Sequence, residues 1–86
     1  MYYVYILKFP KQFYTGSTND LRKRVREHQN GKVFSTKNKG DFKLVYYEAC
    51  LSEKDARLRE IYLKTAWGKR YLKNRIKNNL QLSHGV

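Results

Sequence analysis

The stretch Tyr2–Ser17, YYVYILKFPKQFYTGS, decides the fold of this chain. Two runs within it, Tyr2–Leu7 and Phe13–Gly16, are rich in aromatic and β-branched residues, which favour strands. Residues 8–11 lie between the two runs and contain the only proline of the chain. A short segment of this kind between two strand-like runs predicts a β-hairpin.

The register of this hairpin is expected to bring two phenol groups together. A tight turn pairs residues whose numbers add up to 19, which places Tyr5 opposite Tyr14. Directly opposed residues on one face of an antiparallel pair have Cβ atoms roughly 5 Å apart. Gly16 follows Tyr14 on the same face, and its missing side chain is expected to let a backbone or a phosphate approach closely.

The composition indicates one small, strongly basic domain. The chain has 86 residues, 19 Lys and Arg against 7 Asp and Glu, and a formal net charge of +12. Such a charge excess disfavours folding when apolar content is low, but 41% hydrophobic and 15% aromatic residues argue against disorder. We predict a single domain over residues 1–80 and a frayed tail over residues 81–86.

The charge also indicates the class of partner. Each phosphate contact made by Lys or Arg releases condensed counterions, so a basic surface favours nucleic acid. DNA is the first candidate and RNA the second. The alternatives are a basic surface that is merely solvated and a ribosome-associated protein anchored by its charge.

The cysteine content and the N-terminal residues indicate the compartment. Cys50 is the only cysteine, so the chain has no intrachain disulfide and no CxxC zinc site. This usage is typical of a reducing, cytoplasmic setting. The apolar run Met1–Leu7 is too short for a signal peptide or a membrane-spanning helix, so no membrane association is expected.

The remainder of the chain predicts one more strand and three helices. Asn30-Gly31 is a stop signal, and a polar, basic loop runs from there to Asp41. The predicted elements are a helix over Asn19–His28 capped by Thr18 or Asn19, a strand over Lys43–Cys50, a helix over Ser52–Thr65, and, beyond a break at Gly68, a helix over Lys69–Asn78. This order predicts an α+β fold, a small three-stranded antiparallel sheet flanked by helices.

The first predicted helix turns two polar side chains toward the sheet. Leu21, Val25 and His28 recur at i, i+4 and i+7, and Arg24 borders this stripe. An arginine turned toward a sheet that carries two tyrosines needs an anionic partner, and a substrate phosphate is one such partner. The alternatives are an ion pair of Arg24 inside the fold and, for His28, a core imidazole bonded to a carbonyl.

Several further residues are candidate phosphate contacts. Basic residues on the outer face of the first helix and hydroxyl and lysine side chains of the polar loop suit this role. The expected substrate-binding residues are Gly16, Ser17, Arg22, Lys32, Ser35, Thr36 and Lys37.

The second predicted helix carries one carboxylate on an apolar stripe. Glu60 lies on the same side as Ala56, Leu63 and Trp67. A carboxylate there loses hydration, and binding one divalent metal ion, Mg²⁺ or Mn²⁺, would compensate. The alternative is an ion pair with an arginine, for which the candidates are Arg24, Arg57 and Arg59.

These positions together resemble the GIY-YIG nuclease family, which includes the N-terminal nuclease domain of the excision-repair protein UvrC. The matching positions are Tyr3-Val4-Tyr5, Tyr14-Thr15-Gly16, Arg24, His28 and Glu60. The chain is most similar to small stand-alone bacterial members, which share phrases such as YVYIL over residues 3–7, KLVYYE over residues 43–48 and YLKTxWG over residues 62–68.

The resemblance implies an endonuclease that hydrolyses DNA phosphodiester bonds with one divalent metal. It implies that Tyr5 and Tyr14 hold and deprotonate the attacking water, with Arg24 and the metal favouring the phenolate. It further implies that Arg24 stabilises the charged phosphorane, that His28 assists by hydrogen bonding, and that Glu60 binds the metal.

Three residues depart from the family pattern. Tyr3 replaces a glycine, Thr15 replaces an isoleucine, and Ser17 stands where many members have a lysine. The Ser17 replacement is expected to weaken activity, whereas Tyr3 and Thr15 fit strands and remove no catalytic group.

The chief alternative function is a nucleic-acid-binding module of the same fold that cleaves poorly or depends on a partner. A protein partner that delivers the substrate fits this alternative, since the chain shows no separate DNA-recognition domain. We expect cleavage directed by DNA structure and not by sequence. The preferred DNA structure, the pathway, of which DNA repair is one candidate, and the oligomeric state are left open by the sequence.

Overall fold

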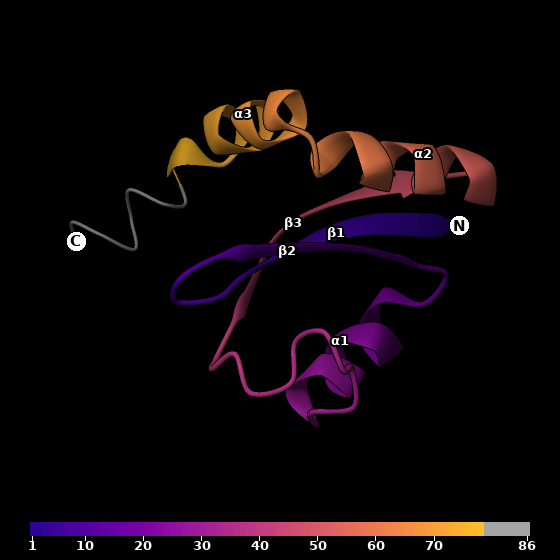
Figure 1. Ribbon diagram of the computed structural model, residues 1–86. Helices are drawn as coiled ribbons and strands as arrows, with labels where there is room; N and C mark the ends of the chain where they lie inside the picture. The colour runs from indigo at the N-terminus through magenta and orange to yellow at the C-terminus, as the bar shows by residue number, and fades with distance from the viewer. Residues whose placement is uncertain (79–86) are drawn as a thin grey trace.

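The computed structural model describes residues 1–78, which form three strands and three helices (Figure 1). In chain order the elements are β1 (Tyr2–Lys8), β2 (Phe13–Thr18), α1 (Leu21–Gln29), β3 (Lys43–Cys50), α2 (Glu53–Leu63) and α3 (Ala66–Arg75). The strands form one antiparallel sheet in the order β2-β1-β3. The predicted α+β class is confirmed, and the tail predicted over residues 81–86 lies outside the described residues. No helix within residues 1–78 has both the length and the apolar character needed to cross a bilayer.

The sheet is covered on both faces. Helices α2 and α3 lie on one face, and α1 lies on the other (Figure 1). Strand β1 is central, so its alternating side chains are buried on both sides. Val4 and Ile6 face α2 and α3, whereas Tyr5 and Leu7 belong to the cluster on the side of α1.

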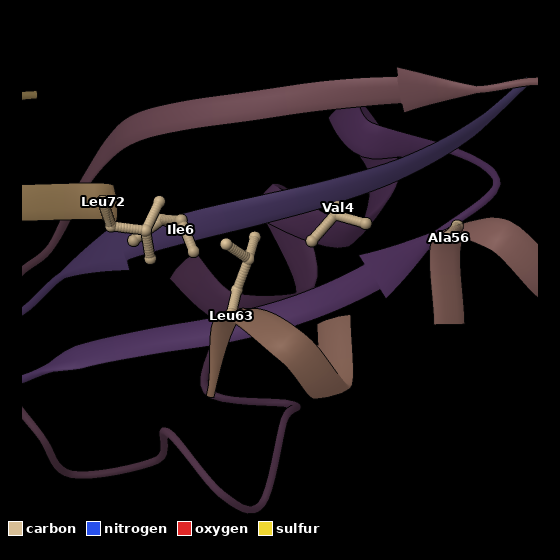
Figure 2. Packing of buried hydrophobic residues seen from close by; sticks show 5 residues of the cluster. All are labelled: Val4, Ile6, Ala56, Leu63 and Leu72. Atoms are coloured by element: carbon tan, nitrogen blue, oxygen red, sulfur yellow. The ribbon is translucent and has the colours of Figure 1, made fainter. Parts of the chain in front are cut away.

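The core beneath α2 and α3 fixes these helices on the sheet. Val4, Ile6, Ala56, Leu63 and Leu72 pack together and are at most 3% exposed (Figure 2). Burying an aliphatic side chain of the size of Val, Leu or Ile contributes about 1.5–3 kcal/mol. This core sets the position of α2 and therefore of Glu60, which is carried on the same helix.

The second cluster lies on the side of α1 and is partly aromatic. Tyr5, Leu7 and Phe9 are fully or almost fully buried. The partly buried residues packed against them are Tyr14, Leu21 and Phe42. The ring of Tyr5 is thus part of the core and not a surface group.

The hairpin register differs by two residues from the predicted one. Tyr5 pairs with Gly16, and Tyr14 pairs with Leu7, so paired numbers add up to 21. Tight two-residue turns need a positive φ, and Pro10 is restricted to φ near −65°. The hairpin instead uses the four-residue loop 9–12, closed by a hydrogen bond from Phe9 N to Gln12 O of 2.8 Å.

Helix α1 begins two residues later than predicted. Asp20 is its N-cap, because its carboxylate accepts a hydrogen bond of 3.1 Å from the backbone N–H of Lys23. Thr18 and Asn19, the predicted caps, do not fill this position. The Thr18 hydroxyl instead accepts from the backbone N–H of Asp20 at 3.1 Å.

Helices α2 and α3 meet in a tight turn, and Gly68 lies within α3 and not before it. Helix α2 ends at Leu63, and Thr65 caps α3 by accepting a hydrogen bond of 3.1 Å from Gly68 N. The helical direction therefore changes before Trp67, which is 68% exposed. The prediction that Trp67 continues the inward stripe of Glu60 is wrong for this reason.

Candidate active site

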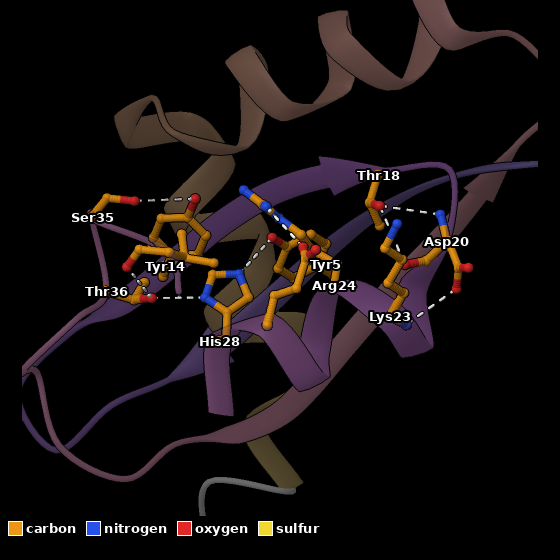
Figure 3. Close-up of polar contacts among 11 residues, drawn as sticks. Tyr5, Tyr14, Thr18, Asp20, Lys23, Arg24, His28, Ser35 and Thr36 are labelled. Carbon is orange, nitrogen blue, oxygen red and sulfur yellow. Dashed lines mark hydrogen bonds and ion pairs between the residues drawn. The ribbon is translucent and has the colours of Figure 1, made fainter. Parts of the chain in front are cut away.

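Four of the predicted site residues meet on the face of the sheet that α1 covers. Tyr5 and Tyr14 come from β1 and β2, and Arg24 and His28 come from α1 (Figure 3). The rings of Tyr5 and Tyr14 lie 6.2 Å apart, and the His28 ring lies 5.6 Å from Tyr5 and 5.2 Å from Tyr14. The two phenols approach diagonally across the hairpin, although the residues are not directly opposed.

His28 links Tyr5 to the loop that follows α1. Its Nε2 lies 2.8 Å from the Tyr5 hydroxyl, and its Nδ1 lies 2.7 Å from Thr36 Oγ1. The Thr36 hydroxyl donates to the carbonyl of Val33 at 3.4 Å, so Thr36 Oγ1 accepts the Nδ1 proton. Nε2 therefore accepts the proton of the Tyr5 hydroxyl.

The charge state of His28 agrees with this arrangement. The side chain is buried, and burial together with the nearby Arg24 guanidinium lowers the pKa of His28. A neutral imidazole has one donor and one acceptor nitrogen, as this chain of hydrogen bonds requires.

Gly16 makes room for the phenol of Tyr5. A Cβ atom at Gly16 would lie 2.5 Å from the Tyr5 hydroxyl oxygen and 2.6 Å from Tyr5 Cζ. The prediction that this space admits a phosphate or a backbone is wrong, because the Tyr5 ring fills it. Gly16 is therefore a packing partner of a site residue and does not itself face a substrate.

The close approach at Gly16 predicts the effect of a single added methyl group. Gly16→Ala forces the Tyr5 ring to move away from His28, and overpacking of this kind costs about 1–3 kcal/mol. Urea unfolding should show this destabilisation, and NMR of the His28 ring should show that Tyr5 has moved away. Unchanged stability together with an unchanged His28 spectrum would contradict the geometry.

The environment of Tyr5 does not favour its phenolate. Burial raises the pKa of Tyr5 to about 12, although the Arg24 guanidinium acts in the opposite direction. Arg24 thus acts on Tyr5 in the expected direction, but desolvation outweighs the charge of this one arginine. In this arrangement Tyr5 keeps its proton and donates it to His28.

Tyr14 is the phenol that remains accessible. Its side chain is half-buried, whereas Tyr5 is fully buried. Its hydroxyl accepts a long hydrogen bond of 3.5 Å from the exposed Ser35. Of the two tyrosines, Tyr14 is thus the one placed to meet a substrate.

Arg24 lies at the rim of the site and pairs with a neighbour on its own helix. Its guanidinium donates to Glu27 Oε1 at 3.1 Å, and its side chain is 37% exposed. The ion pair considered as an alternative exists, but it is at the surface and leaves other guanidinium donors available. Arg24 also lines a cavity of about 370 Å³ together with Ser17, Lys23 and Arg57.

Glu60 is held by two donors. Ser17 Oγ donates to Oε1 at 2.6 Å, and Lys64 Nζ lies 2.9 Å from Oε2. Partial burial disfavours the charge, but these hydrogen bonds outweigh it and lower the pKa of Glu60. Glu60 is thus ionised and oriented.

None of the arginines considered as alternative partners of Glu60 pairs with it. Arg59 binds Glu48 through two hydrogen bonds of 2.9 and 3.0 Å, and Arg57 binds Glu53 at 3.1 Å. Arg24 binds Glu27. The salt bridge of Glu60 with Lys64 spans one helical turn, a spacing that favours such pairs.

Glu60 reaches the site around the edge strand β2. Tyr5 and Gly16 lie on the α1 side of the sheet, whereas Ser17, the next residue of β2, turns to the other side and bonds Glu60. The electrostatic influence of Glu60 nevertheless extends to Tyr5, whose pKa it helps to raise. The five candidate catalytic residues therefore lie along the edge strand β2, with Tyr14 near its start and Glu60 held by Ser17 near its end.

The predicted substrate-binding residues separate into three groups. Ser35, Lys32 and Lys37 are exposed on the loop after α1, as expected for phosphate contacts. Thr36 is buried against His28, and the Ser17 hydroxyl is used by Glu60, so both act on site residues instead. Arg22 borders a different hollow, between α1 and β3, whose lining includes Tyr47 and none of the five candidate catalytic residues.

The donor set around Glu60 fits a weakly held hard cation. Residues 1–78 contain no cluster of three or more His, Cys, Asp or Glu side chains that could form a complete metal cage. Mg²⁺ commonly binds through one or two carboxylates and keeps water or substrate phosphate as its other ligands. One ionised, partly exposed carboxylate beside a hydroxyl is compatible with that mode.

Comparison with known proteins identifies the family. The model of the GIY-YIG catalytic domain matches residues 1–79, which is almost the whole chain. The chain belongs to the GIY-YIG family. Its two tyrosine motifs, Arg24, His28 and Glu60 thus lie within a nuclease-type domain, for which a nucleic acid is the implied substrate.

The similar proteins are small UPF0213 proteins. A UPF0213 protein of Clostridium perfringens is 46% identical over 66 residues, covering 74% of this chain and 71% of the relative. A UPF0213 protein of Limosilactobacillus reuteri is 34% identical over 89 residues, covering 99% and 86%. The solution NMR structure of a UPF0213 protein from Bacillus halodurans has a TM-score of 0.55 at 34% identity, covering 85% of this chain and 82% of that one.

Proposed function

We propose that this GIY-YIG protein is a metal-dependent endonuclease that hydrolyses DNA phosphodiester bonds. The observation that carries the proposal is the convergence of two phenols, a guanidinium, a neutral imidazole and an ionised carboxylate around β2. Hydrolysis requires a proton acceptor for water and positive charge where the phosphorane develops, and this set offers both.

In the proposed mechanism the phenolate of Tyr14, formed by loss of its hydroxyl proton to solvent, accepts the proton of the attacking water, because Tyr14 is the accessible phenol. The oxygen of that water bonds to phosphorus, and the bond from phosphorus to the leaving sugar oxygen breaks. Tyr5 and His28 are joined by a hydrogen bond of 2.8 Å. Their rings pack against the ring of Tyr14 and hold it in place. They act here as positioning residues.

Arg24 and Glu60 serve to stabilise the negative charge that develops on the phosphate in the proposed mechanism. Arg24 donates to a non-bridging phosphate oxygen, where negative charge grows in the transition state. Glu60 holds one Mg²⁺ or Mn²⁺ ion, which when bound supplies positive charge to the phosphate and the leaving oxygen. Lys64, which pairs with Glu60 at 2.9 Å, adds positive charge beside the same carboxylate.

The residues of the site indicate how a substrate is selected. The accessible groups are suited to phosphate oxygens and not to base edges, so cleavage should follow DNA structure more than sequence. A protein partner that delivers the substrate is compatible with this proposal.

Cleavage of labelled DNA tests the proposal. Single-stranded, duplex, flap and four-way DNA, with an RNA strand for comparison, are incubated with Mg²⁺ or Mn²⁺ and with a chelator at low salt. Cleavage that requires the metal is the expected result. Binding to all of these without cleavage, at any metal concentration, would favour the non-catalytic nucleic-acid-binding module.

Arg24→Gln is expected to lower the cleavage rate about 10²- to 10³-fold, because removal of one preorganised donor to developing charge has effects of this size. Arg26→Gln on the same helix is the matched control, since Arg26 is exposed and does not line the cavity beside Ser17. The measurement is single-turnover cleavage at saturating protein. Equal rates for the two variants would exclude the role given to Arg24.

A further inference from the structure

A second hollow lies between the β1–β2 hairpin and the helices α2 and α3, next to Tyr14. Its volume is about 700 Å³, and it is larger than the cavity beside Ser17. Five lysines line it, and none of its lining residues is acidic: Lys8, Lys11, Lys64, Lys69 and Lys73. We refer to this hollow as the lysine groove.

The charge of the lysine groove is largely uncompensated. Among the ion pairs found in residues 1–78, only the one between Lys64 and Glu60 involves a lysine of the groove. Lys8 donates to the backbone carbonyls of Phe9 and Pro10, which carry no net charge. Several ammonium groups around one hollow repel one another, and a polyanion would relieve this repulsion.

The lysine groove is continuous with the candidate active site at two residues. Tyr14 lines the groove and packs against the ring of His28 at 5.2 Å. Lys64 lines the groove and binds the carboxylate of Glu60 at 2.9 Å. Because Tyr14 and Lys64 both line the groove, a chain of phosphates that reaches these two residues would enter it directly.

The opposite end of β2 has a different charge. The cavity beside Ser17 is lined by Lys23, Arg24 and Arg57, but also by acidic residues, which are Asp20, Glu27 and Glu53. Acidic groups repel phosphates, so this end does not offer an equally favourable path. The asymmetry gives the substrate one preferred direction along the edge strand.

We propose that the lysine groove binds the sugar-phosphate backbone of the substrate strand on one side of the scissile phosphate. This inference rests on the proposed function, because the groove is assigned to the substrate strand on the ground that it adjoins the proposed catalytic residues. The apolar floor formed by Phe13, Leu63 and Leu72 offers contact area to sugars, and the lysines contact phosphates. Binding in the groove is accordingly independent of base sequence.

The test is binding of a fluorescein-labelled single-stranded DNA of mixed sequence, measured in chelator so that cleavage plays no part. Lys69→Gln combined with Lys73→Gln should weaken binding roughly tenfold or more at moderate salt. The slope of log K against log salt should fall by about 0.7 for each phosphate of the single strand that the variant no longer neutralises. Both effects are read from one salt titration.

The matched control removes the same charge elsewhere. Arg70→Gln combined with Lys54→Gln lies on exposed parts of α3 and α2 that do not line the groove. The control should change affinity and salt slope much less than the groove variant. Circular dichroism establishes that both variants are folded, and Lys69→Arg with Lys73→Arg should restore binding because the charge is kept.

The outcomes separate this inference from the proposed function. If the groove variant binds DNA as the control variant does, the lysine groove is not the path of the substrate, whether or not the protein cleaves DNA. If the groove variant binds weakly while the wild type never cleaves, the groove assignment stands and the endonuclease proposal fails. If the groove variant is unfolded, Lys11→Gln on the hairpin loop, outside the helices, replaces it and should weaken binding by the smaller amount expected for one ammonium group.

Discussion

Glu60→Gln should lower metal-dependent DNA cleavage by at least about 10³-fold, which corresponds to about 4 kcal/mol of transition-state stabilisation. The amide keeps the size of the side chain and can still accept the hydrogen bond from Ser17. It lacks the negative charge that a hard cation requires of its protein ligand. The measurement is the single-turnover cleavage rate as a function of Mg²⁺ or Mn²⁺ concentration.

Asp55→Asn is the matched control for Glu60→Gln. Asp55 is an exposed carboxylate on the same helix and takes part in none of the ion pairs found in residues 1–78. Its substitution removes the same charge without touching β2 and should leave cleavage within a few-fold of wild type. A wild-type cleavage rate in Glu60→Gln, or an equal decrease of the rate in both variants, would show that Glu60 does not bind the metal.

The ion pair of Glu60 also predicts that the free energy of unfolding depends on pH. The pKa of Glu60 is lowered below its ordinary value of 4.5 in the folded state. A carboxylate of this kind stabilises the fold above its unfolded pKa, and the contribution is lost as the pH falls through the folded pKa. The stability difference between wild type and Glu60→Gln should therefore be largest near neutral pH and shrink below about pH 4.

Gly68→Ala is expected to destabilise the fold by about 3 kcal/mol or more. A Cβ atom at this position would lie 2.1 Å from the carbonyl oxygen of Tyr62 and 2.4 Å from the Cα atom of Leu63. Alanine favours helices over glycine by about 1 kcal/mol, but both neighbours are backbone atoms at the end of α2 and cannot rotate away. The clash therefore outweighs the gain in helix propensity, and the turn between α2 and α3 must open.

Gly31→Ala is the control for Gly68→Ala, with urea unfolding as the measurement. Gly31 has a φ of +69° and no atom within 4 Å of an added Cβ, so only the backbone conformation is affected. A left-handed conformation costs roughly 1–2 kcal/mol for a residue with a side chain. The loss of unfolding free energy in Gly68→Ala should exceed this value. A smaller loss would show that α2 and α3 separate easily.

The fold was largely predictable because the residue types of β1 by themselves indicate a buried central strand. Every residue from Val4 to Leu7 is apolar or aromatic, which is typical of a strand buried on both faces, and such a strand must be central. The strand over Lys43–Cys50 has in the structure the bounds that its sequence predicts. The hairpin register does not follow the prediction, because Pro10 excludes the two-residue turn on which that register depends.

The candidate site was predictable as a set of residues but not as an arrangement. The helical spacing in α1 correctly brought His28 inward and left Arg24 at the border. No local pattern showed that Gly16 lies against the Tyr5 ring, or that Thr36 fixes the imidazole of His28. These contacts join residues that are 11 and 8 positions apart, across a strand pairing and a loop.

The sequence by itself determined the strands, the approximate helices, the family and the identity of the five candidate catalytic residues, because these depend on residue types and short spacings. Only the tertiary structure decided which tyrosine remains accessible, which donors hold Glu60, and where the lysines gather. Lys8 and Lys11 come from the hairpin, whereas Lys69 and Lys73 come from α3, more than fifty residues later. Their proximity depends on the packing of Leu63 and Leu72 against the sheet, and a contact of this range leaves no periodic signal in the chain.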